Sequence, residues 1–566
     1  MAVKGNLSIW EAESQGVELL NSTIGDILDR QAQLTPDKEA LIYNYPEIGL
    51  NLRLNFKQYR EEVNKVAKGL IALGIQKGEH VAIWAINVPE WILVQLAFAK
   101  IGAVLVTINT SYRPAELEYA LRQGDITTLF MTETFRKNSY LETIYGLVPE
   151  LKEIADPVNS SLNSPGLPKL KRVVLFGDKP QSGTLLFSQV VALGEQLSDE
   201  VLQQRQSTVT PQDVALVMYT SGTTGFPKGA MLTHNNILNE IHCSIRGVDY
   251  SSERYVGTMP LFHIAGLSFM LSGIISGYTV ISMLGFDPTK VLELIAQEKA
   301  TVSFCVPTML VAMLNHPRFL AGEFDMSSLN WIATGGTAVP VVLMEQVKEK
   351  LGADCKIFFG MTESAGGGTT TLDEDPFGLK SSTVGTPFPH LEVKIVNPTT
   401  GEAVPIGEPG ELLMRGYIVM KGYYNMPEKT AETIDPEGWL HTGDQAVMNA
   451  QGYVNIVGRI KDMIIRGGEN VYPAEIEQFL MRHPKVSEAQ VVGVPDAYMG
   501  EEMVAFLNLK PDEKLTEAEV QQYCRANISR HKIPKYVQFV SDYPMTASGK
   551  VRKVELREQA IKYFGL

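Results

Sequence analysis

The chain has 566 residues, of which 45% are hydrophobic, and a formal net charge of −14. That length exceeds what one hydrophobic core usually supports, so at least two domains are expected, and the acidic balance argues against a nucleic-acid partner. From residue 459 onward 16 Lys and Arg stand against 15 Asp and Glu, so the acidity belongs to the N-terminal part.

Short apolar runs alternate with helical patterns along the first two thirds of the chain. Strands are predicted at 80–86, 103–108 and 127–131, with helices at 89–100 and 114–121 between them. Such strand–helix–strand repetition predicts parallel sheets with helices on both faces. The polar, Pro- and Ser-rich stretch 156–169 is predicted to be a surface loop before a strand at 172–176.

A run of glycines and hydroxyl side chains that ends in one lysine occupies 219–229, YTSGTTGFPKG. Glycines let backbone N–H groups approach an anion, hydroxyls add donors, and lysine adds a positive charge. The Walker A loop of P-loop NTPases does not fit, because Phe226 and Pro227 separate the second glycine from Lys228. The run therefore indicates a phosphate-binding loop of another kind.

The stretch 259–286 has no charged residue, yet it does not predict a membrane span. Proline, glycines and hydroxyls interrupt it, and a helix followed by a buried strand at 278–283 explains it. The N-terminus carries no secretory signal, and four cysteines lack any paired spacing: Cys243, Cys305, Cys355 and Cys524. A reduced, cytoplasmic protein without a transmembrane segment is expected.

The pattern changes after about residue 391, where short β runs at 392–396, 411–415 and 453–456 predict a β-rich subdomain. Further on, Pro473 opens a predicted helix and Thr516 with Glu519 forms a capping box. Strands are predicted at 490–494 and 504–510.

The predicted fold class is α/β. We expect a large N-terminal domain of parallel α/β sheets at 1–458, which includes a β-rich subdomain at 391–458. A small mobile α+β C-terminal domain is expected at 459–566, with a hinge near Lys461.

Six segments, taken together and in this order, resemble the motifs of the adenylate-forming superfamily, which includes acyl-CoA synthetases, firefly-type luciferases and peptide-synthetase adenylation domains. They are YTSGTTGFPKG at 219–229, PLFH at 260–263, FGMTE at 359–363, GWLHTGD at 438–444, GRIKD at 458–462 and SGK at 548–550. The resemblance implies that ATP activates a carboxylic acid to acyl-AMP with release of pyrophosphate, and that the acyl group then passes to CoA.

The resemblance also implies a role for each matched residue. The predicted catalytic residues are His263, Thr362, Glu363 and Lys550, with Glu363 as the Mg2+ ligand. The residues predicted to bind ATP and CoA are Thr220, Ser221, Gly222, Thr223, Thr224, Gly225, Lys228, Gly336, Gly360, Met361, Asp444, Arg459, Gly467 and Gly468. In this family Lys550 serves adenylation and then withdraws about the hinge, so that residues 466–470 and CoA can approach. His263 is expected to position the acyl group rather than act as a base, because the substrate carboxylate is already ionised.

The predicted acyl pocket is rich in small residues, namely Ala265, Gly266, Gly335, Gly336, Ala365 and Gly366. Missing side chains predict room for a medium or longer aliphatic chain, which favours a fatty-acid–CoA ligase. An aryl-acid ligase of the benzoate or coumarate kind, transfer to a carrier protein and a luciferase-type oxygenase stay open. A catalytically silent homologue is disfavoured, because Lys228, Glu363, Asp444 and Lys550 are all present.

The expected partners are the small molecules alone: the acid, ATP and CoA. The sequence leaves open whether the protein forms a homodimer or touches a membrane surface.

Overall fold

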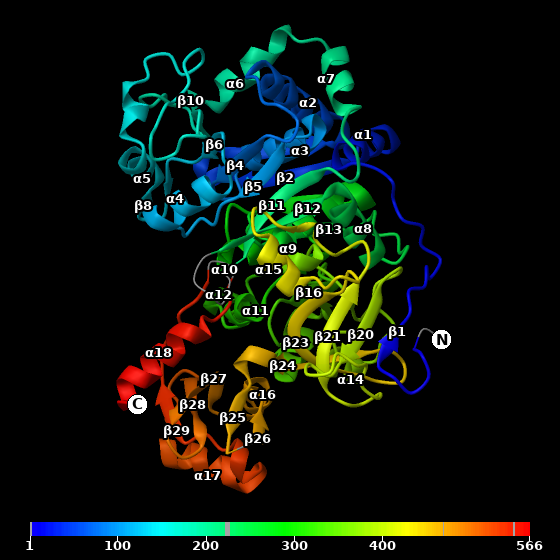
Figure 1. Cartoon of the computed structure of the whole chain (residues 1–566), viewed down its shortest axis with the longest axis vertical. Coiled ribbons are helices and arrows are strands. Elements are labelled where there is room, and N and C mark those ends of the chain that lie inside the picture. Colours follow the sequence, from blue (N-terminus) through cyan, green and yellow to red (C-terminus); the bar gives the residue numbers. More distant parts are fainter. Residues whose placement is uncertain (1–2, 221–226, 468, 547–548) are drawn as a thin grey trace.

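The computed structural model describes residues 3–220, 227–467, 469–546 and 549–566, with the backbone alone at Asn470. Two large mixed sheets form the main body, and a smaller sheet lies beside them. A further sheet with its own helices forms a lobe at the lower end of Figure 1. The predicted α/β class, with a large N-terminal part and a C-terminal domain, is confirmed.

An eight-stranded sheet is built around the parallel strands predicted in the N-terminal part. Its strands in spatial order are β10 (Leu185–Leu186), β9 (Arg172–Leu175), β6 (Thr128–Met131), β4 (His80–Trp84), β5 (Val104–Thr107), β11 (Val214–Thr220), β12 (Lys228–Thr233) and β22 (Gly422–Tyr423). All neighbours from β10 to β11 pair in parallel, whereas β12 and β22 join antiparallel. Its central strands are continuous apolar runs because helices and loops cover both faces.

A nine-stranded sheet is likewise built around parallel strands. Its strands in order are β19 (Thr386–Pro387), β18 (Thr369–Thr370), β17 (Asp354–Phe359), β16 (Trp331–Gly335), β15 (Val302–Phe304), β13 (Arg254–Gly257), β14 (Thr279–Ser282), β2 (Glu39–Tyr45) and β3 (Leu50–Asn55). The interior from β17 to β2 is parallel, and antiparallel strands close both ends.

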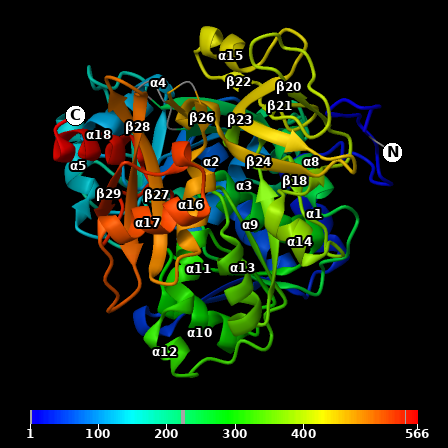
Figure 2. The same cartoon turned by 90° about the horizontal axis from the view of Figure 1, so that it is seen from below.

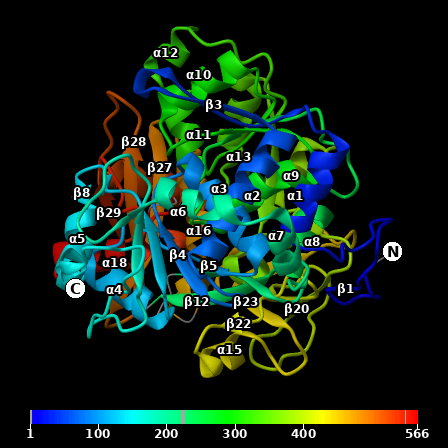
Figure 3. The same ribbon diagram turned by 90° about the horizontal axis from the view of Figure 1, so that it is seen from above.

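One hydrophobic core joins the two large sheets through five helices: α1 (Ile24–Leu34), α2 (Phe56–Ala72), α3 (Pro89–Ile101), α8 (His234–Ser244) and α9 (Ile264–Ser276). The view from above shows α1 and α2 close to α8 and α9 (Figure 3). Helix α3 starts at a proline and ends at Gly102, whose φ of 74° is left-handed. Nearly all of its side chains are buried, so it is apolar all round.

The remaining helices of this part are α4 (Pro114–Gln123), α5 (Tyr140–Leu147), α6 (Phe187–Leu193), α7 (Asp199–Gln206), α10 (Pro288–Glu298), α11 (Pro307–Leu314), α12 (Pro317–Leu320), α13 (Val341–Gln346), α14 (Phe377–Ser382) and α15 (Pro427–Thr433). A hairpin of β7 (Thr134–Phe135) and β8 (Asn138–Ser139) precedes α5. The uncharged stretch 259–286 forms α9 and β14, as predicted. Among the described residues, no helix combines the length and the apolar character that crossing a membrane requires.

The predicted β-rich region forms an antiparallel five-stranded sheet of β1 (Ile9–Trp10), β20 (Glu392–Val396), β21 (Gly410–Arg415), β23 (Leu440–Met448) and β24 (Val454–Arg459). The N-terminal strand β1 pairs with β20, which is distant from it in the sequence. Sequence patterns did not indicate this long-range pairing.

The C-terminal lobe contains β25 (Ile464–Arg466), β26 (Glu469–Val471), β27 (Val486–Asp496), β28 (Gly500–Leu509), β29 (Tyr536–Phe539), α16 (Pro473–Met481), α17 (Glu517–Asn527) and α18 (Lys553–Phe564). It has a hydrophobic cluster of its own, and Thr516 and Glu519 form the predicted capping box of α17. Helix α16 contacts β24, so the lobe lies against the smaller sheet (Figure 2).

The stretch 156–169 contains no helix or strand, as predicted, but it is not wholly a surface loop. Leu162 and Leu167 are buried in the core cluster that covers β6 and β9, and Ser164 is buried beside them. Leucines spaced along a polar stretch thus anchor it to the core.

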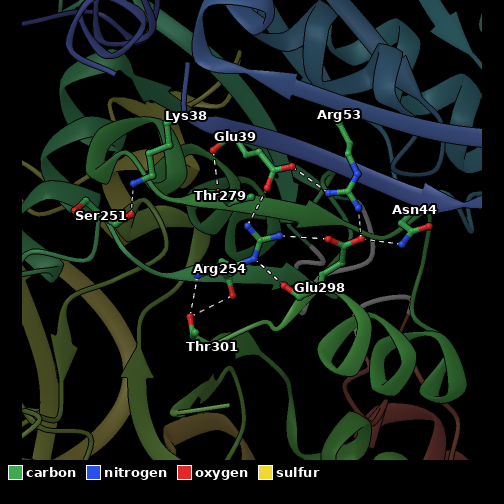
Figure 4. Close-up of polar contacts among 9 residues, drawn as sticks. All are labelled: Lys38, Glu39, Asn44, Arg53, Ser251, Arg254, Thr279, Glu298 and Thr301. Atoms are coloured by element: carbon green, nitrogen blue, oxygen red, sulfur yellow. Dashed lines mark hydrogen bonds and ion pairs between the residues drawn. The ribbon is translucent and has the colours of Figure 1, made fainter. Parts of the chain in front are cut away.

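A polar network ties β2 and β3, the last two strands of the nine-stranded sheet, to β13 and α10 (Figure 4). The buried carboxylate of Glu298, the last residue of α10, accepts hydrogen bonds from Asn44 at 2.7 Å and from Arg254 at 3.3 Å, and it also pairs with Arg53. Both arginines pair in turn with Glu39 at 3.0 Å. These residues link four elements and are not among the residues that line the large cavity described below, so we assign them a structural role.

Candidate active site

The predicted phosphate loop connects two strands of the eight-stranded sheet. Thr220 at the end of β11 pairs in antiparallel register with Lys228 at the start of β12, so both ends of the loop are fixed. Five predicted loop residues lie outside the described part of the chain: Ser221, Gly222, Thr223, Thr224 and Gly225. The amine of Lys228 lies over the ring of Tyr423, 4.3 Å from its centroid.

Glu363 stands opposite these strands on a short 3-10 turn, Thr362–Ser364, that follows β17. Its Oε1 accepts hydrogen bonds from the hydroxyls of Thr220 at 3.2 Å and Tyr423 at 2.7 Å. Burial, together with the Glu363 charge, raises the pKa of Tyr423 far above its usual value, so this phenol stays a donor. No sequence pattern marked Tyr423, which reaches the site only because β22 pairs with β12.

The backbone requires glycine once within the FGMTE segment and once just after it. A Cβ on Gly360 would lie 2.4 Å from the carbonyl oxygen of Gly366, and Gly366 itself has a φ of 106°. Met361 donates its N–H to the hydroxyl of Ser364 at 3.0 Å. This compact turn fixes Thr362 and Glu363 at the edge of the cavity described below.

Asp444 and Arg459 face each other on the paired strands β23 and β24. Arg459 Nε lies 2.9 Å from Asp444 Oδ1, and the carboxylate is buried. Burial raises the pKa of Asp444, while Arg459, Lys461 and Lys550 oppose that rise. The pair puts a carboxylate acceptor and a guanidinium donor at one edge of the smaller sheet.

Lys550 reaches the same place from the C-terminal lobe. A Cβ on Gly336, just after β16, would lie 3.3 Å from Lys550 Cε and 3.6 Å from its Nζ. The carbonyl oxygen of Gly549 accepts a hydrogen bond from Thr308 of α11 at 3.3 Å, which docks the lysine segment. Burial, and then Arg459, lower the pKa of Lys550, whereas Asp444 and Glu363 oppose this effect.

His263 caps the N-terminus of α9. Its Nδ1 accepts the backbone N–H of Ala265 at 3.3 Å. Burial, aided by the nearby Lys550 charge, lowers the pKa of His263 to about 3. The imidazole is therefore neutral at physiological pH.

A continuous cavity of about 3040 Å³ joins these groups. The predicted site residues that line it are Thr220, Lys228, His263, Gly336, Gly360, Met361, Thr362, Glu363, Asp444, Arg459 and Lys550. The described residues contain no cluster of three or more metal-ligating side chains. A single buried carboxylate with hydroxyl neighbours nevertheless suits Mg2+, which commonly takes one or two carboxylates together with substrate phosphates.

Residues 466–467 do not line this cavity. Gly467 donates its N–H to the carbonyl oxygen of Met499 at 2.8 Å and does not line the cavity. Arg466 pairs with Glu502 at 2.8 Å and donates to three lobe carbonyl groups, so its guanidinium group is engaged within the lobe. Gly468 is outside the described residues.

The small residues of the predicted acyl wall do not all create space. A Cβ on Gly266 would lie 2.2 Å from the carbonyl oxygen of Pro260, and one on Gly335 would lie 2.0 Å from that of Phe358. Neighbouring backbone fills both places. The argument from missing side chains to a long acyl chain is therefore wrong at these positions.

The family comparisons cover most of the chain. Residues 28–424 match the AMP-binding enzyme family, and residues 475–550 match the AMP-binding enzyme C-terminal domain. YngI of Bacillus subtilis strain 168, whose name assigns it provisionally to the acyl-CoA synthetases, is 44% identical over 552 residues, which are 97% of this chain and 99% of YngI. The mitochondrial medium-chain acyl-CoA ligase ACSF2 of Mus musculus is 40% identical over 571 residues, which cover 99% of this chain and 91% of ACSF2.

A solved structure agrees with these relatives. The anthranilate CoA ligase AuaEII in complex with anthranoyl-AMP superposes with a TM-score of 0.83 at 27% identity, over 98% of this chain and 100% of that one. Fold and site together define an adenylate-forming enzyme. The chain belongs to the AMP-binding enzyme family, which confirms the predicted resemblance and the predicted class of AMP-forming acid–thiol ligase.

Proposed function

We propose that the protein activates a fatty acid of medium or longer chain to acyl-AMP, releases pyrophosphate and transfers the acyl group to CoA. The observation that carries the proposal is the convergence of Lys550, Asp444, Arg459 and Glu363 on one cavity, which His263 also lines. The relatives named medium-chain acyl-CoA ligase support the aliphatic acid.

The adenylation step gathers negative charge on the carboxylate, the α-phosphate and the leaving pyrophosphate. Lys550 would bridge the carboxylate and the α-phosphate, while Thr362 contacts that phosphate. Lys228 and the loop at 220–225 would hold the β- and γ-phosphates. Asp444 would accept both ribose hydroxyls, with Arg459 beside it.

Glu363 would hold Mg2+, which supplies positive charge that offsets the charge of the phosphates. Its carboxylate already accepts two hydrogen bonds through Oε1, so its orientation is fixed before substrate binds. Neutral His263 would orient the acyl end of the acid. No protein base is required, because the attacking carboxylate is ionised.

The second half-reaction needs the space that Lys550 occupies. We infer a division into domains at 1–458 and 459–566, with the hinge at Lys461 in the 3-10 turn Ile460–Asp462 that directly follows β24. Rotation there would withdraw Lys550 and bring residues 466–470 toward the cavity, where Gly467 and Gly468 would admit the pantetheine arm of CoA.

A panel of acids tests this function. Release of AMP and pyrophosphate is measured with hexanoate, octanoate, dodecanoate, palmitate and benzoate, each with and without CoA. Fatty acids should support pyrophosphate release, and CoA should accelerate turnover. Preference for benzoate would instead favour an aryl-acid ligase, the second candidate, which the likeness to an anthranilate CoA ligase supports. Adenylate formation that CoA never discharges would point to a carrier-protein acceptor.

A further inference from the structure

The strand that carries Asp444 is irregular where it reaches the cavity. β23 pairs with β21 before and after this place, but three residues of β23, 442–444, lie opposite the single residue Leu412 of β21. Such a bulge bends a strand and turns its side chains in a new direction, and bulges are common beside active sites. The direction of the Asp444 side chain therefore depends on what holds the bulge.

Backbone conformation and one threonine hold part of the bulge. Gly443, in its middle, has a φ of 68°, a left-handed conformation that favours glycine. Thr442 Oγ1 donates to the carbonyl oxygen of Leu412 at 2.7 Å and accepts the backbone N–H of Asp444 at 3.1 Å. The threonine thus ties the bulge both to the neighbouring strand and to the aspartate.

The side chain of Glu411, on β21, holds the rest of the bulge. Its Oε1 accepts the backbone N–H of Gly443 at 3.2 Å, and its Oε2 lies 3.0 Å from Nδ1 of His441. Only 13% of this side chain is exposed. A hydrogen bond from a backbone N–H to a carboxylate is stronger than one to a neutral acceptor. Glu411 therefore grips the residues on both sides of Thr442.

The carboxylate of Asp444 has a second neighbour, which constrains it less. Arg459 Nε lies 2.9 Å from Asp444 Oδ1, but 46% of the arginine side chain is exposed. Exposed ion pairs contribute little to the fixing of a geometry. Glu411, His441, Gly443 and Asp444 all line the cavity, so the bulge and its support belong to the wall of the site.

We propose that Glu411 is a positioning residue for the nucleotide site, and that its hydrogen bonds to the bulge direct the carboxylate of Asp444 toward the ribose hydroxyls of ATP. The inference rests on the proposed function, because Glu411 acts through the role given there to Asp444. A carboxylate that binds two hydroxyls needs both oxygens in place, so a displacement of about 1 Å weakens both hydrogen bonds.

The ribose hydroxyls themselves serve as the probe in the test. Pyrophosphate release with octanoate is measured for ATP, 2′-deoxyATP and 3′-deoxyATP, and kcat/KM for ATP is divided by that for each deoxynucleotide. The wild-type enzyme should favour ATP at least about tenfold, because a missing hydroxyl leaves an oxygen of Asp444 without its partner. Glu411→Ala should reduce this ratio to less than about threefold, because activity with ATP falls far more than activity with the deoxynucleotides.

Three further variants serve as controls. Glu411→Gln keeps an oxygen that can accept the N–H of Gly443, so it should retain most of the preference for ATP. Asp444→Ala should abolish the preference. Glu392, on the neighbouring strand β20, pairs with Arg415 at 2.6 Å. Glu392→Ala thus removes a carboxylate from the same sheet and should leave the preference unchanged.

The results distinguish failure of the inference from failure of the function. An unchanged ratio in Glu411→Ala, or an equal loss with all three nucleotides, would overturn the positioning role and leave the ligase activity standing. A preference for ATP that survives Asp444→Ala, or a wild-type enzyme without that preference, would reject the role of Asp444 and the inference with it. Absence of pyrophosphate release with every acid would reject the proposed function as well. If Glu411→Ala does not fold, Glu411→Asp, which withdraws the carboxylate from both partners, decides by the same ratio.

Discussion

At the scale of single residues, the contacts of Glu363 support its proposed role as the Mg2+ ligand. Its carboxylate is buried and is oriented by the hydroxyls of Thr220 and Tyr423, and the amine of Lys228 lies over the Tyr423 ring. A carboxylate held in this way keeps its charge available for Mg2+.

We therefore propose Glu363→Gln, which removes the negative charge of the side chain but keeps its size and a carbonyl acceptor. Glutamine keeps an oxygen that can accept from Thr220 and Tyr423, so thermal stability should change little. Pyrophosphate release should fall roughly 100-fold and require more magnesium, because the negative ligand is lost. Initial rates over a magnesium series measure this effect.

Tyr423→Phe is the matched control, because it removes one hydrogen bond to the same carboxylate. Its rate should fall by less than about tenfold. Full activity of Glu363→Gln at low magnesium would show that this residue is not the ligand.

Sequence motifs predicted which residues line the cavity, but they did not predict the shape of the acyl pocket. Thr220, Lys228, Glu363, Asp444 and Lys550 carry distinctive patterns, and they meet in one cavity. Tyr423 has no local signal, because its position depends on the pairing of β22 with β12. Glycines such as Gly266 and Gly335 were misinterpreted, since a sequence does not reveal whether a missing side chain leaves space or admits backbone.

At the scale of elements, helix ends were predictable where the cap is local. Pro473 at the start of α16 and Thr516 at the cap of α17 follow from their own neighbours. Helix α1 has a local capping box of Thr23 and Asp26, but the ring of His234 at the start of α8 also accepts the backbone N–H of Ile24, at 3.2 Å. The His234 cap joins residues far apart in the sequence, and no local pattern indicates it.

This cap gives a dependence of stability on pH. Burial lowers the pKa of His234 to about 4, against about 6.5 in the unfolded chain. The unfolded state therefore binds the proton more readily, and the stability from neutral His234 is present above pH 6.5 and is lost as the pH falls toward 4. Between pH 7 and pH 5 this loss should be about 2 kcal/mol.

Thermal unfolding of wild type and His234→Gln at both pH values measures the loss. Glutamine can cap α1 without titrating, so the variant should lose less stability on acidification. An equal fall in melting temperature for both proteins would contradict the assignment.

At the scale of the whole molecule, the C-terminal lobe puts Lys550 into the main cavity while Gly467 stays outside it. The sequence predicted the parallel sheets, the β-rich region and the α+β lobe, because the spacing of apolar residues differs from one of these regions to the next. The pairing of β1 with β20 and the docking of Gly549 on Thr308 were not, because both depend on contacts between distant segments. Under the proposed function this arrangement suits adenylation, and the second half-reaction would require the lobe to move.

The most direct test of this account is to measure both half-reactions separately in Lys550→Ala. Acyl-adenylate formation should fall at least roughly 100-fold, because the transition state loses its bridging charge. Thioester formation from supplied acyl-adenylate and CoA should change by less than about tenfold, because Lys550 has withdrawn at that stage. Equal losses in the two half-reactions would contradict the alternation of the lobe between them.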